Sequence, residues 1–291
     1  MPHKRKILIL GSSGMLGHAL FLVLNQNPNF ETLGTVRNLE HTMNSTLGRL
    51  FLKDGSDQNA VCKIIEDHQP NVIINAIGLI KQKASSINDA RMREVNSLLP
   101  QKLSAIANKI GAFVIHFSTD CVFSGLKGDY TEADVADAED VYGRSKFLGE
   151  LHDPHTLTLR TSIIGHELKS SKSLMDWFLS QENIVSGYKN ALFSGLTTIE
   201  VAKVVSSIIE KNMPISGLYH LSCNKISKYD LLKLINEVYE KGILIEPDYK
   251  LVIDRSLDSE KFKSAMNYTP PKWRAMLSEL RKFYSNDASF R

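Results

Sequence analysis

The sequence predicts an α/β fold built on a doubly wound parallel sheet, and three observations support this prediction. Short apolar runs alternate with stretches of helical periodicity from residue 7 to about residue 118. The first run leads directly into a glycine-rich turn, and later runs end in small or hydroxyl-bearing residues. The chain of 291 residues is 43% apolar and 23% charged, which is typical of a globular protein with a large buried core.

The first element is a strand over residues 7–10, because this run is continuously apolar, as in strands buried on both faces. Glycines with the spacing G-x-x-G-x-x-G follow it, and residues 15–24 have the periodicity of a helix. In such a strand, turn and helix, backbone N–H groups and the helix dipole can receive a pyrophosphate. We therefore expect a bound dinucleotide here. The residues expected to contact it are Gly11, Ser13, Gly14, Met15, Leu16 and Gly17.

The second strand, over residues 32–36, ends in Arg37, where a chain that binds NAD usually has an acid for the adenosine ribose. A guanidinium at this place favours a 2′-phosphate, so we predict NADPH in preference to NADH, with an ordinary solvated arginine as the alternative. A short third strand is predicted over residues 50–52, before a helix over residues 59–68. Between them, Asp54 either contacts the adenine or starts a turn.

The fourth strand lies within residues 71–78 and ends in Ala76 and Gly78, whose small size lets a cofactor lie against the backbone. After a helix over residues 90–109, a fifth strand over residues 112–117 leads into Ser118-Thr119-Asp120. The hydroxyl of Thr119 at this strand end is well placed to hold a carbonyl oxygen.

Tyr142 and Lys146 are four residues apart, so on a helix they project from one face. An ammonium beside a phenol favours the phenolate, whose usual pKa is near ~10. Such a pair is common on solvated helices, but right-handed crossovers would bring Gly11, Gly78, Thr119 and Tyr142 to one cleft. We therefore interpret Tyr142 and Lys146 as an acid/base pair.

The regular alternation ends after a sixth strand over residues 157–164. We predict a Rossmann-like, NADP-binding domain of residues 1–165, to which residues of about 196–221 return. A smaller mixed, mostly helical substrate-binding lid is predicted from residues of about 166–195 and 222–291.

Composition and charge argue against several classes of protein. The net charge of +3 is small and the basic residues are scattered, which argues against nucleic acid as a partner. Three cysteines lie far apart without a C-x-x-C pair, as in a reducing compartment. The first apolar run is too short for a signal peptide, and no segment is long enough to cross a membrane. We therefore expect a cytoplasmic protein. We also expect no metal site, because Pro154 breaks the helix that would align His152 with His155.

The motifs G-S-S-G-M-L-G at residues 11–17, S-T-D-C-V-F-S-G at residues 118–125 and Y-G-R-S-K at residues 142–146 resemble the extended short-chain dehydrogenase/reductase superfamily. Within it, the chain is similar to the dTDP-4-dehydrorhamnose reductase family over nearly its whole length. The resemblance implies that Tyr142 donates a proton and that Lys146 holds the nicotinamide ribose and lowers the pKa of Tyr142. It also implies a cofactor contact by both residues.

The same resemblance implies that Thr119 hydrogen-bonds the reacting carbonyl and that Asp120 orients substrate or proton. Cys121 stands where the family usually has tyrosine, and we expect it to contact the substrate together with Phe123. Trp177 is either a packing residue or a platform for a sugar. Arg255 lies in a region that resembles the family's segment near the substrate nucleotide, so we expect it to contact a diphosphate.

These observations predict an NADPH-dependent reductase of a nucleotide-activated 4-keto-6-deoxysugar, made for surface polysaccharide or another glycan. Hydride would reach the C4 ketone and Tyr142 would supply the proton. A sugar-nucleotide epimerase or dehydratase of the same superfamily is one alternative. A non-catalytic, NADP-binding subunit similar to the beta regulatory subunit of methionine adenosyltransferase is another. The expected binding partner is a nucleotide sugar. The sequence does not decide between a monomer and a homodimer.

Overall fold

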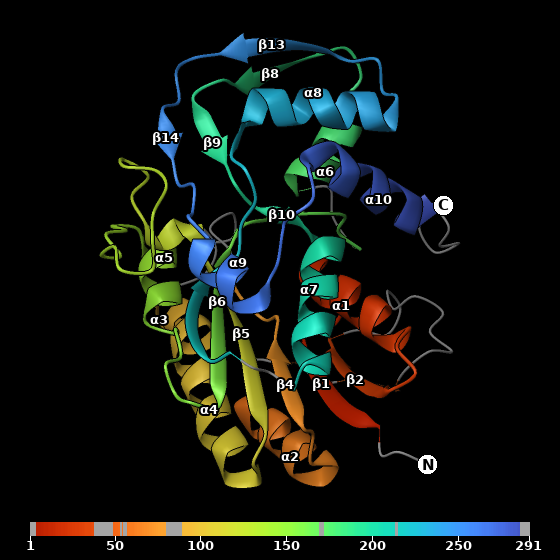
Figure 1. Cartoon of the computed structure of the whole chain (residues 1–291), viewed down its shortest axis with the longest axis vertical. Helices are drawn as coiled ribbons and strands as arrows, with labels where there is room; N and C mark the ends of the chain where they lie inside the picture. Colours follow the sequence, from red (N-terminus) through yellow and green to blue (C-terminus); the bar gives the residue numbers. More distant parts are fainter. Residues whose placement is uncertain are drawn as a thin grey trace.

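The computed structural model describes residues 4–37, 49–52, 54, 57–79, 89–168, 172–212 and 215–285. A large sheet with helices on both faces forms the lower part of the molecule in Figure 1, and small sheets and helices form the upper part. The predicted α/β class, with a smaller mixed C-terminal part, is confirmed.

The large sheet has seven parallel strands in the order β11-β6-β5-β4-β1-β2-β3. Their bounds are β1 (Arg5–Leu10), β2 (Phe30–Val36), β3 (Arg49–Leu52), β4 (Val72–Asn75), β5 (Phe113–Thr119), β6 (Thr156–Thr161) and β11 (Gly217–His220). The order reverses between β1 and β4, and open α/β sheets bind ligands at the carboxyl ends of the strands beside such a switch point. From this topology we expect a ligand to bind beside the carboxyl ends of β1, β4 and β5.

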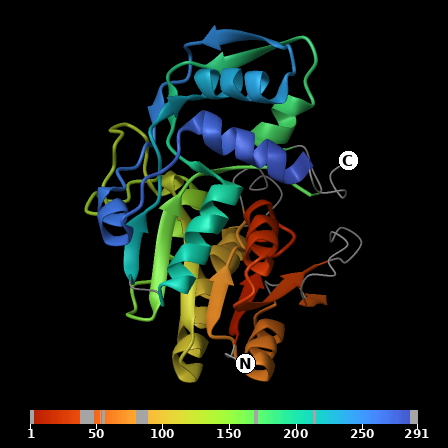
Figure 2. The same cartoon turned by 45° about the vertical axis from the view of Figure 1, so that its right-hand side comes forward.

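Strands β1 and β4 at the centre of this sheet are mostly apolar because helices cover both of its faces. Alternate residues of β1 point to opposite faces, so Ile7 and Ile9 join one buried cluster and Leu8 and Leu10 join another. Helices α1 (Met15–Asn25) and α7 (Thr198–Glu210) cover the first face, as Figure 2 shows. Helices α2 (Gln58–His68) and α4 (Leu99–Ile110) cover the second.

Two predicted elements are divided in the structure. The helix expected over residues 90–109 consists of α3 (Asp89–Arg93), a π-helical turn η2 (Glu94–Leu98) and α4. The strand expected over residues 157–164 ends at Thr161, and the short strand β7 (Ile163–Ile164) pairs instead with β10 (Leu196–Thr197). A π-helical turn often marks a place where a side chain has a particular task.

The C-terminal part contains short strands that the sequence did not predict. It comprises α6 (Leu174–Leu179), β8 (Ile184–Tyr188), β9 (Ala191–Phe193), β12 (Ile226–Ser227), α8 (Lys228–Tyr239), β13 (Leu244–Asp248), β14 (Ile253–Asp254), α9 (Glu260–Met266) and α10 (Trp273–Ser285). Strands β8 and β13 pair in parallel, and β9 lies between β12 and β14. These strands are short, and glycine, proline and acidic residues interrupt their apolar pattern.

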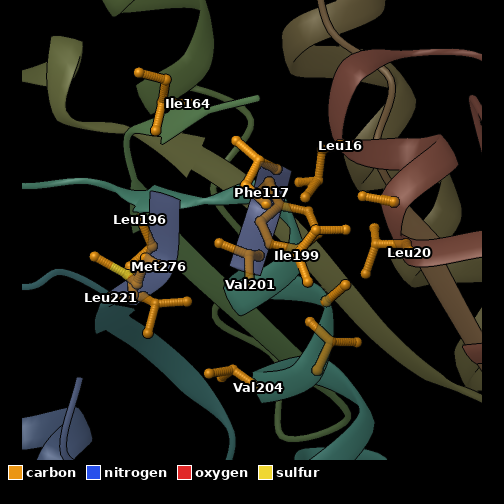
Figure 3. Packing of buried hydrophobic residues seen from close by; sticks show 14 of the residues in the cluster. Leu16, Leu20, Phe117, Ile164, Leu196, Ile199, Val201, Val204, Leu221 and Met276 are labelled. Atoms are coloured by element: carbon orange, nitrogen blue, oxygen red, sulfur yellow. The ribbon is translucent and has the colours of Figure 1, made fainter. Parts of the chain in front are cut away.

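The two parts of the molecule share one continuous core. In Figure 3, Leu16 and Leu20 of α1 approach Ile199 of α7, while Met276 of α10 lies beside Leu196. Strand β11 also pairs in parallel with β6, so a segment beyond residue 196 completes the sheet. The division into two domains at the expected boundaries remains a prediction.

Candidate functional site

The glycine turn between β1 and α1 has the close packing that a phosphate-binding turn requires. Gly11 has a positive φ of 87°, and a Cβ there would lie 2.9 Å from Ile77 Cγ1. A Cβ at Gly17 would collide with the Gly11 carbonyl oxygen. Among the described residues, no side chain caps the first turn of α1, and that turn contains no acid. The N–H groups at this helix start are therefore suited to an anion such as a pyrophosphate.

The residues expected at the adenosine end lie near the other edge of the sheet. Arg37 is exposed directly after β2, and its neighbours 38–48 lie outside the described residues. Asp54 lines a surface pocket of about 400 Å³ together with Asn59 and Arg91. The assignment of these two positions to a cofactor remains a prediction.

The end of β4 faces the helix that carries Lys146. A Cβ at Gly78 would lie 3.9 Å from Lys146 Nζ, and Ala76 directly follows the strand. Asn96, in the π-helical turn, is fully buried and links this strand end to α5 (Val141–Phe147). Its Oδ1 accepts from the Leu79 N–H at 2.8 Å, and its Nδ2 donates to Ser145 Oγ at 3.0 Å. Asn96 thereby holds the two walls of the crevice together.

Helix α5 packs directly on the segment after β5. The Asp140 carboxylate caps it by accepting from the Gly143 N–H at 3.0 Å. A side chain at Gly143 would collide with the Cys121 carbonyl oxygen, so only glycine allows this approach. The packing brings Tyr142 next to Thr119, whose hydroxyl influences the pKa of the phenol.

Lys146 is 5% exposed, and its ammonium donates to the Phe117 carbonyl oxygen at 2.6 Å. Burial lowers the pKa of Lys146 to about 8, although the negative charge of Glu150 opposes the shift. The ammonium is thus fixed against strand β5, and it loses its proton at a lower pH than an ordinary lysine does.

The pKa of Tyr142 departs from what the sequence predicted. Burial raises it above its usual value, the acidic groups of Cys121, Asp120 and Asp140 raise it further, and the Thr119 hydroxyl opposes the rise. We expected Lys146 to lower this pKa, but its ammonium is directed to the backbone of β5 instead. The phenol therefore keeps its proton at neutral pH, as a proton donor must.

Thr119 and Asp120 are both buried at the end of β5. The Thr119 hydroxyl donates to Asp120 Oδ1 at 3.1 Å and accepts from the Cys121 N–H at 3.1 Å. The short 3₁₀ turn η3 (Asp120–Val122) follows directly. These bonds fix the hydroxyl beside the phenol, so the structure brings the four predicted catalytic side chains to one strand end.

A buried ion pair that the sequence analysis missed lies behind these groups. Arg160 donates from Nε and Nη2 to the two carboxylate oxygens of Glu150, at 2.7 and 2.8 Å, and both side chains are at most 3% exposed. Ser118 Oγ donates to the same carboxylate at 2.6 Å. Burial lowers the pKa of His220, so its neutral ring can accept from Arg160 Nη1 at 3.3 Å. The signal in the sequence was an acid four residues after Lys146.

A pocket of about 410 Å³ adjoins the strand end and extends under β8, β9 and α8. Cys121, Trp177 and Arg255 line it, together with Asp120. Arg255 donates from Nε to the Phe123 carbonyl oxygen at 2.8 Å, and its Nη1 lies 3.7 Å from Cys121 Sγ. Burial raises the pKa of Cys121 to about 12, so its thiol stays neutral.

The structure does not support Phe123 as a substrate contact. Its side chain is fully buried and stacks on Tyr130 with ring centroids 4.1 Å apart. Arg160 covers the ring at 5.0 Å, so the phenylalanine belongs to the packing behind the site. Lys228, by contrast, lines the pocket and was not predicted. It is the first residue of α8, and the sequence analysis assigned it no role.

The described residues contain no cluster of three or more histidine, cysteine, aspartate or glutamate side chains that could hold a metal ion. No helix within the described ranges has the length and apolarity needed to cross a bilayer.

The chain is similar to two groups of proteins. It is 27% identical over 303 residues to a dTDP-4-dehydrorhamnose reductase of Aggregatibacter actinomycetemcomitans, a match that covers 96% of this chain and 99% of the relative. It is also 27% identical over 248 residues to methionine adenosyltransferase 2 subunit beta of Bos taurus, covering 81% of this chain and 72% of that relative.

A solved structure extends this similarity to the fold. The dTDP-4-dehydrorhamnose reductase of Bacillus anthracis str. Ames, in complex with NADP, matches with a TM-score of 0.79 at 19% identity, over 96% of this chain and 99% of that chain. The family model described as the RmlD substrate binding domain matches residues 5–285. The resemblance found in the sequence is therefore confirmed, and the chain belongs to the RmlD substrate binding domain family.

Proposed function

We propose that this protein is an NADPH-dependent reductase of a nucleotide-activated 4-keto-6-deoxysugar, which acts in the cytoplasm in the synthesis of a surface polysaccharide or glycan precursor. The observation that carries the proposal is the close packing of α5 on the segment after β5, which puts the protonated Tyr142 phenol within the influence of the Thr119 hydroxyl. Membership of a family that includes NAD(P)-dependent sugar reductases supports it.

The chain offers a suitable set of residues for the cofactor. The turn from Gly11 to Gly17 would take the pyrophosphate, because its glycines leave room and the first N–H groups of α1 are uncapped. Ala76 and Gly78 would line the nicotinamide side, and Lys146 would bind its ribose. Arg37 and Asp54 would contact the adenosine half. When bound, the reduced nicotinamide supplies the hydride for the ketone carbon.

The side chains at the strand end act on the oxygen of the ketone. The Thr119 hydroxyl turns its proton from Asp120 to the ketone oxygen and polarises it together with Tyr142, and Tyr142 transfers its proton as the alkoxide develops. With a pKa of about 8, Lys146 is still mostly charged at neutral pH, so its ammonium would be available to donate to the nicotinamide ribose. Before substrate binds, Asp120 holds the Thr119 hydroxyl at the strand end by accepting its proton.

The test is a turnover assay with NADPH and a panel of nucleotide 4-ketosugars, followed by the loss of NADPH absorbance. Tyr142→Phe should lower kcat/KM by about 10²- to 10⁴-fold, the usual contribution of a general acid. NADPH affinity, measured by fluorescence titration, should change little. Full activity in Tyr142→Phe would refute the assignment of the proton donor.

A second candidate is a non-catalytic, NADP-binding subunit, favoured by the similarity to methionine adenosyltransferase 2 subunit beta over 81% of the chain. It predicts NADPH binding without turnover on any sugar nucleotide, together with a protein that co-purifies. An epimerase or dehydratase would instead retain tightly bound NAD through purification. The co-purifying protein and the retained NAD can both be looked for in the same purified sample. The molecular mass of that sample distinguishes a monomer from a homodimer.

A further inference from the structure

Glu150 follows the helix that carries Lys146, and the backbone between the two residues is fixed in place. Helix α5 ends one residue after Lys146, and the Glu150 N–H then donates to the Phe147 carbonyl oxygen at 3.1 Å. A Cβ at Gly149 would collide with the Asn96 carbonyl oxygen, so this turn packs backbone to backbone on η2. The position of Glu150 relative to Lys146 is therefore set by the fold.

The side chains of Lys146 and Glu150 contact neighbouring residues of β5. Lys146 Nζ donates to the Phe117 carbonyl oxygen at 2.6 Å, and the next residue, Ser118, donates from Oγ to Glu150 Oε1 at 2.6 Å. Arg160 on β6 binds the same carboxylate with Nε and Nη2, at 2.7 and 2.8 Å. The side chains of Lys146, Ser118, Glu150 and Arg160 belong to residues that are at most 5% exposed. A buried carboxylate with three donors thus lies close to a buried ammonium.

His116 faces Lys146 from β5, but it adds no charge. Burial and the charge of Lys146 both lower the pKa of His116, so its ring stays neutral. Asn75 Oδ1 accepts from the Ile77 N–H at 3.2 Å, so its Nδ2 donates to His116 Nδ1 at 3.1 Å. The neutral ring therefore carries its proton on Nε2. A Cβ at Gly78, after β4, would lie 3.9 Å from Lys146 Nζ, and this residue is uncharged as well.

The other charged groups around α5 are exposed or act on a different residue. Asp120, in the turn after β5, raises the pKa of the Tyr142 phenol. Helix α3 also packs against α5, and its exposed arginines are Arg91 and Arg93. Among the described residues, Glu150 is the charged group that acts on the pKa of Lys146. Its negative charge opposes the effect of burial, which by itself would lower this pKa further.

We propose that Glu150 is a positioning residue, whose buried carboxylate keeps the Lys146 ammonium charged so that it can bind the nicotinamide ribose. The proposal rests on the proposed function for the identity of this ligand, whereas the contacts that carry it lie within the protein. Arg160 and Ser118 hold the carboxylate in place. Without the negative charge, the buried lysine loses its proton at a lower pH, and its hold on the cofactor weakens.

The experiment first follows the titration of Lys146 itself, by NMR of protein labelled with ¹³C at the lysine ε-carbons. Lys146→Met identifies its signal. Glu150→Gln keeps the shape and removes the charge, so it should move the midpoint of the Lys146 titration down by about one pH unit or more. Glu150→Asp keeps the charge and alters the shape, so it should move the midpoint less than about half as far.

The matched control is Glu139→Gln, which removes an exposed acid near the other end of α5. Because water screens its charge, the midpoint of Lys146 should stay within about 0.3 pH unit. The second measurement is the affinity for NADP⁺ as a function of pH. It should fall as the pH rises through the Lys146 midpoint, and this fall should begin at a lower pH in Glu150→Gln. A purely structural role would weaken binding equally at every pH.

Far-ultraviolet circular dichroism shows whether each variant is folded. Glu150→Gln/Arg160→Met, which also removes the unmatched guanidinium, replaces Glu150→Gln if that variant does not fold. An unchanged Lys146 midpoint without the Glu150 charge, or an equal change in Glu150→Asp, overturns the proposal. An NADP⁺ affinity that does not follow the midpoint, or no NADP⁺ binding by the wild type, overturns it as well. The expected shifts in a protein that turns over no sugar nucleotide support the role of Glu150 while rejecting the reductase.

Discussion

The two sides of the cleft differ in how their polar side chains are matched. On the side of the large sheet, Lys146 donates to a carbonyl oxygen of β5, and Glu150 is paired with Arg160 out of contact with water. On the side of the C-terminal part, Lys228 makes no hydrogen bond or ion pair within the described ranges, and Arg255 keeps one terminal nitrogen free. The polar groups on the sheet side are thus satisfied within the protein, whereas the two cations on the other side keep donors without a partner among the described residues.

Removal of the buried Glu150 carboxylate should have the largest effect on stability, because it removes the partner of Arg160 on the sheet side. Glu150→Ala would leave the Arg160 guanidinium as an unmatched buried charge, and should lower the free energy of unfolding by about 3–5 kcal/mol. Glu237, whose side chain is 50% exposed in its pair with Arg274, is the matched control. Glu237→Ala should cost at most about 1 kcal/mol, since water screens exposed ion pairs.

Urea denaturation of the two variants, followed by circular dichroism, measures both effects. Equal losses in Glu150→Ala and Glu237→Ala would mean that burial adds nothing to the Glu150–Arg160 pair. An unfolded Glu150→Ala variant would agree with the prediction, because a loss of this size is a large share of the stability of an ordinary domain.

The titration of Lys146 should change the free energy of unfolding by an intermediate amount. Its pKa is lowered from the ordinary lysine value of 10.5 to about 8 in the folded protein, so between these values the unfolded chain binds more protons. The destabilisation by its buried charge is therefore complete below pH 8 and is relieved as the pH rises above it. Relative to Lys146→Met, the protein should gain about 2–3 kcal/mol of stability between pH 8 and pH 10.

Denaturation curves of the wild type and Lys146→Met over this pH range test the sign and the size. A constant difference between the two proteins would show that the ammonium is solvated rather than buried against β5. The same curves recorded with saturating NADPH would show whether cofactor binding changes the environment of this group.

Substitution of Trp177 should have the smallest effect of the three. It tests the side of the cleft that the C-terminal part forms. The indole lines the pocket and is 36% exposed, so its removal should leave the fold intact. In an active reductase, Trp177→Ala should raise KM about 2- to 10-fold with little change in kcat, as expected for an aromatic contact to a sugar. A loss of kcat without a change in KM would instead place the tryptophan on the catalytic side.

Local patterns in the sequence were sufficient to predict the sheet and the strand-end residues. The glycine turn, the small residues after β4 and the hydroxyl after β5 each follow from a short segment, so their chemistry can be read without the rest of the chain. The spacing of Tyr142 and Lys146 is likewise a feature of one short segment. Their assignment to catalysis remains a prediction.

Contacts between distant segments could not be predicted in the same way. Arg160 meets His220 only because β11 pairs with β6, and Lys189 meets Asp230 only because β8 packs against α8. Phe123 was assigned to the substrate because of its neighbours in the motif, but a motif does not say which way a side chain points. The short strands β8 and β13 lacked an apolar pattern long enough to recognise.

The pairing of β11 with β6 has a consequence for how the protein is made. Strands β1 to β6 are synthesised first, whereas β11, which pairs with β6, and helix α7, which covers α1, emerge later. Until then, the apolar side of α1 has no cover and the edge of β6 has no neighbour. We therefore expect a nascent chain that ends between β6 and α7 to expose the edge of β6 and the apolar side of α1 until these later elements emerge.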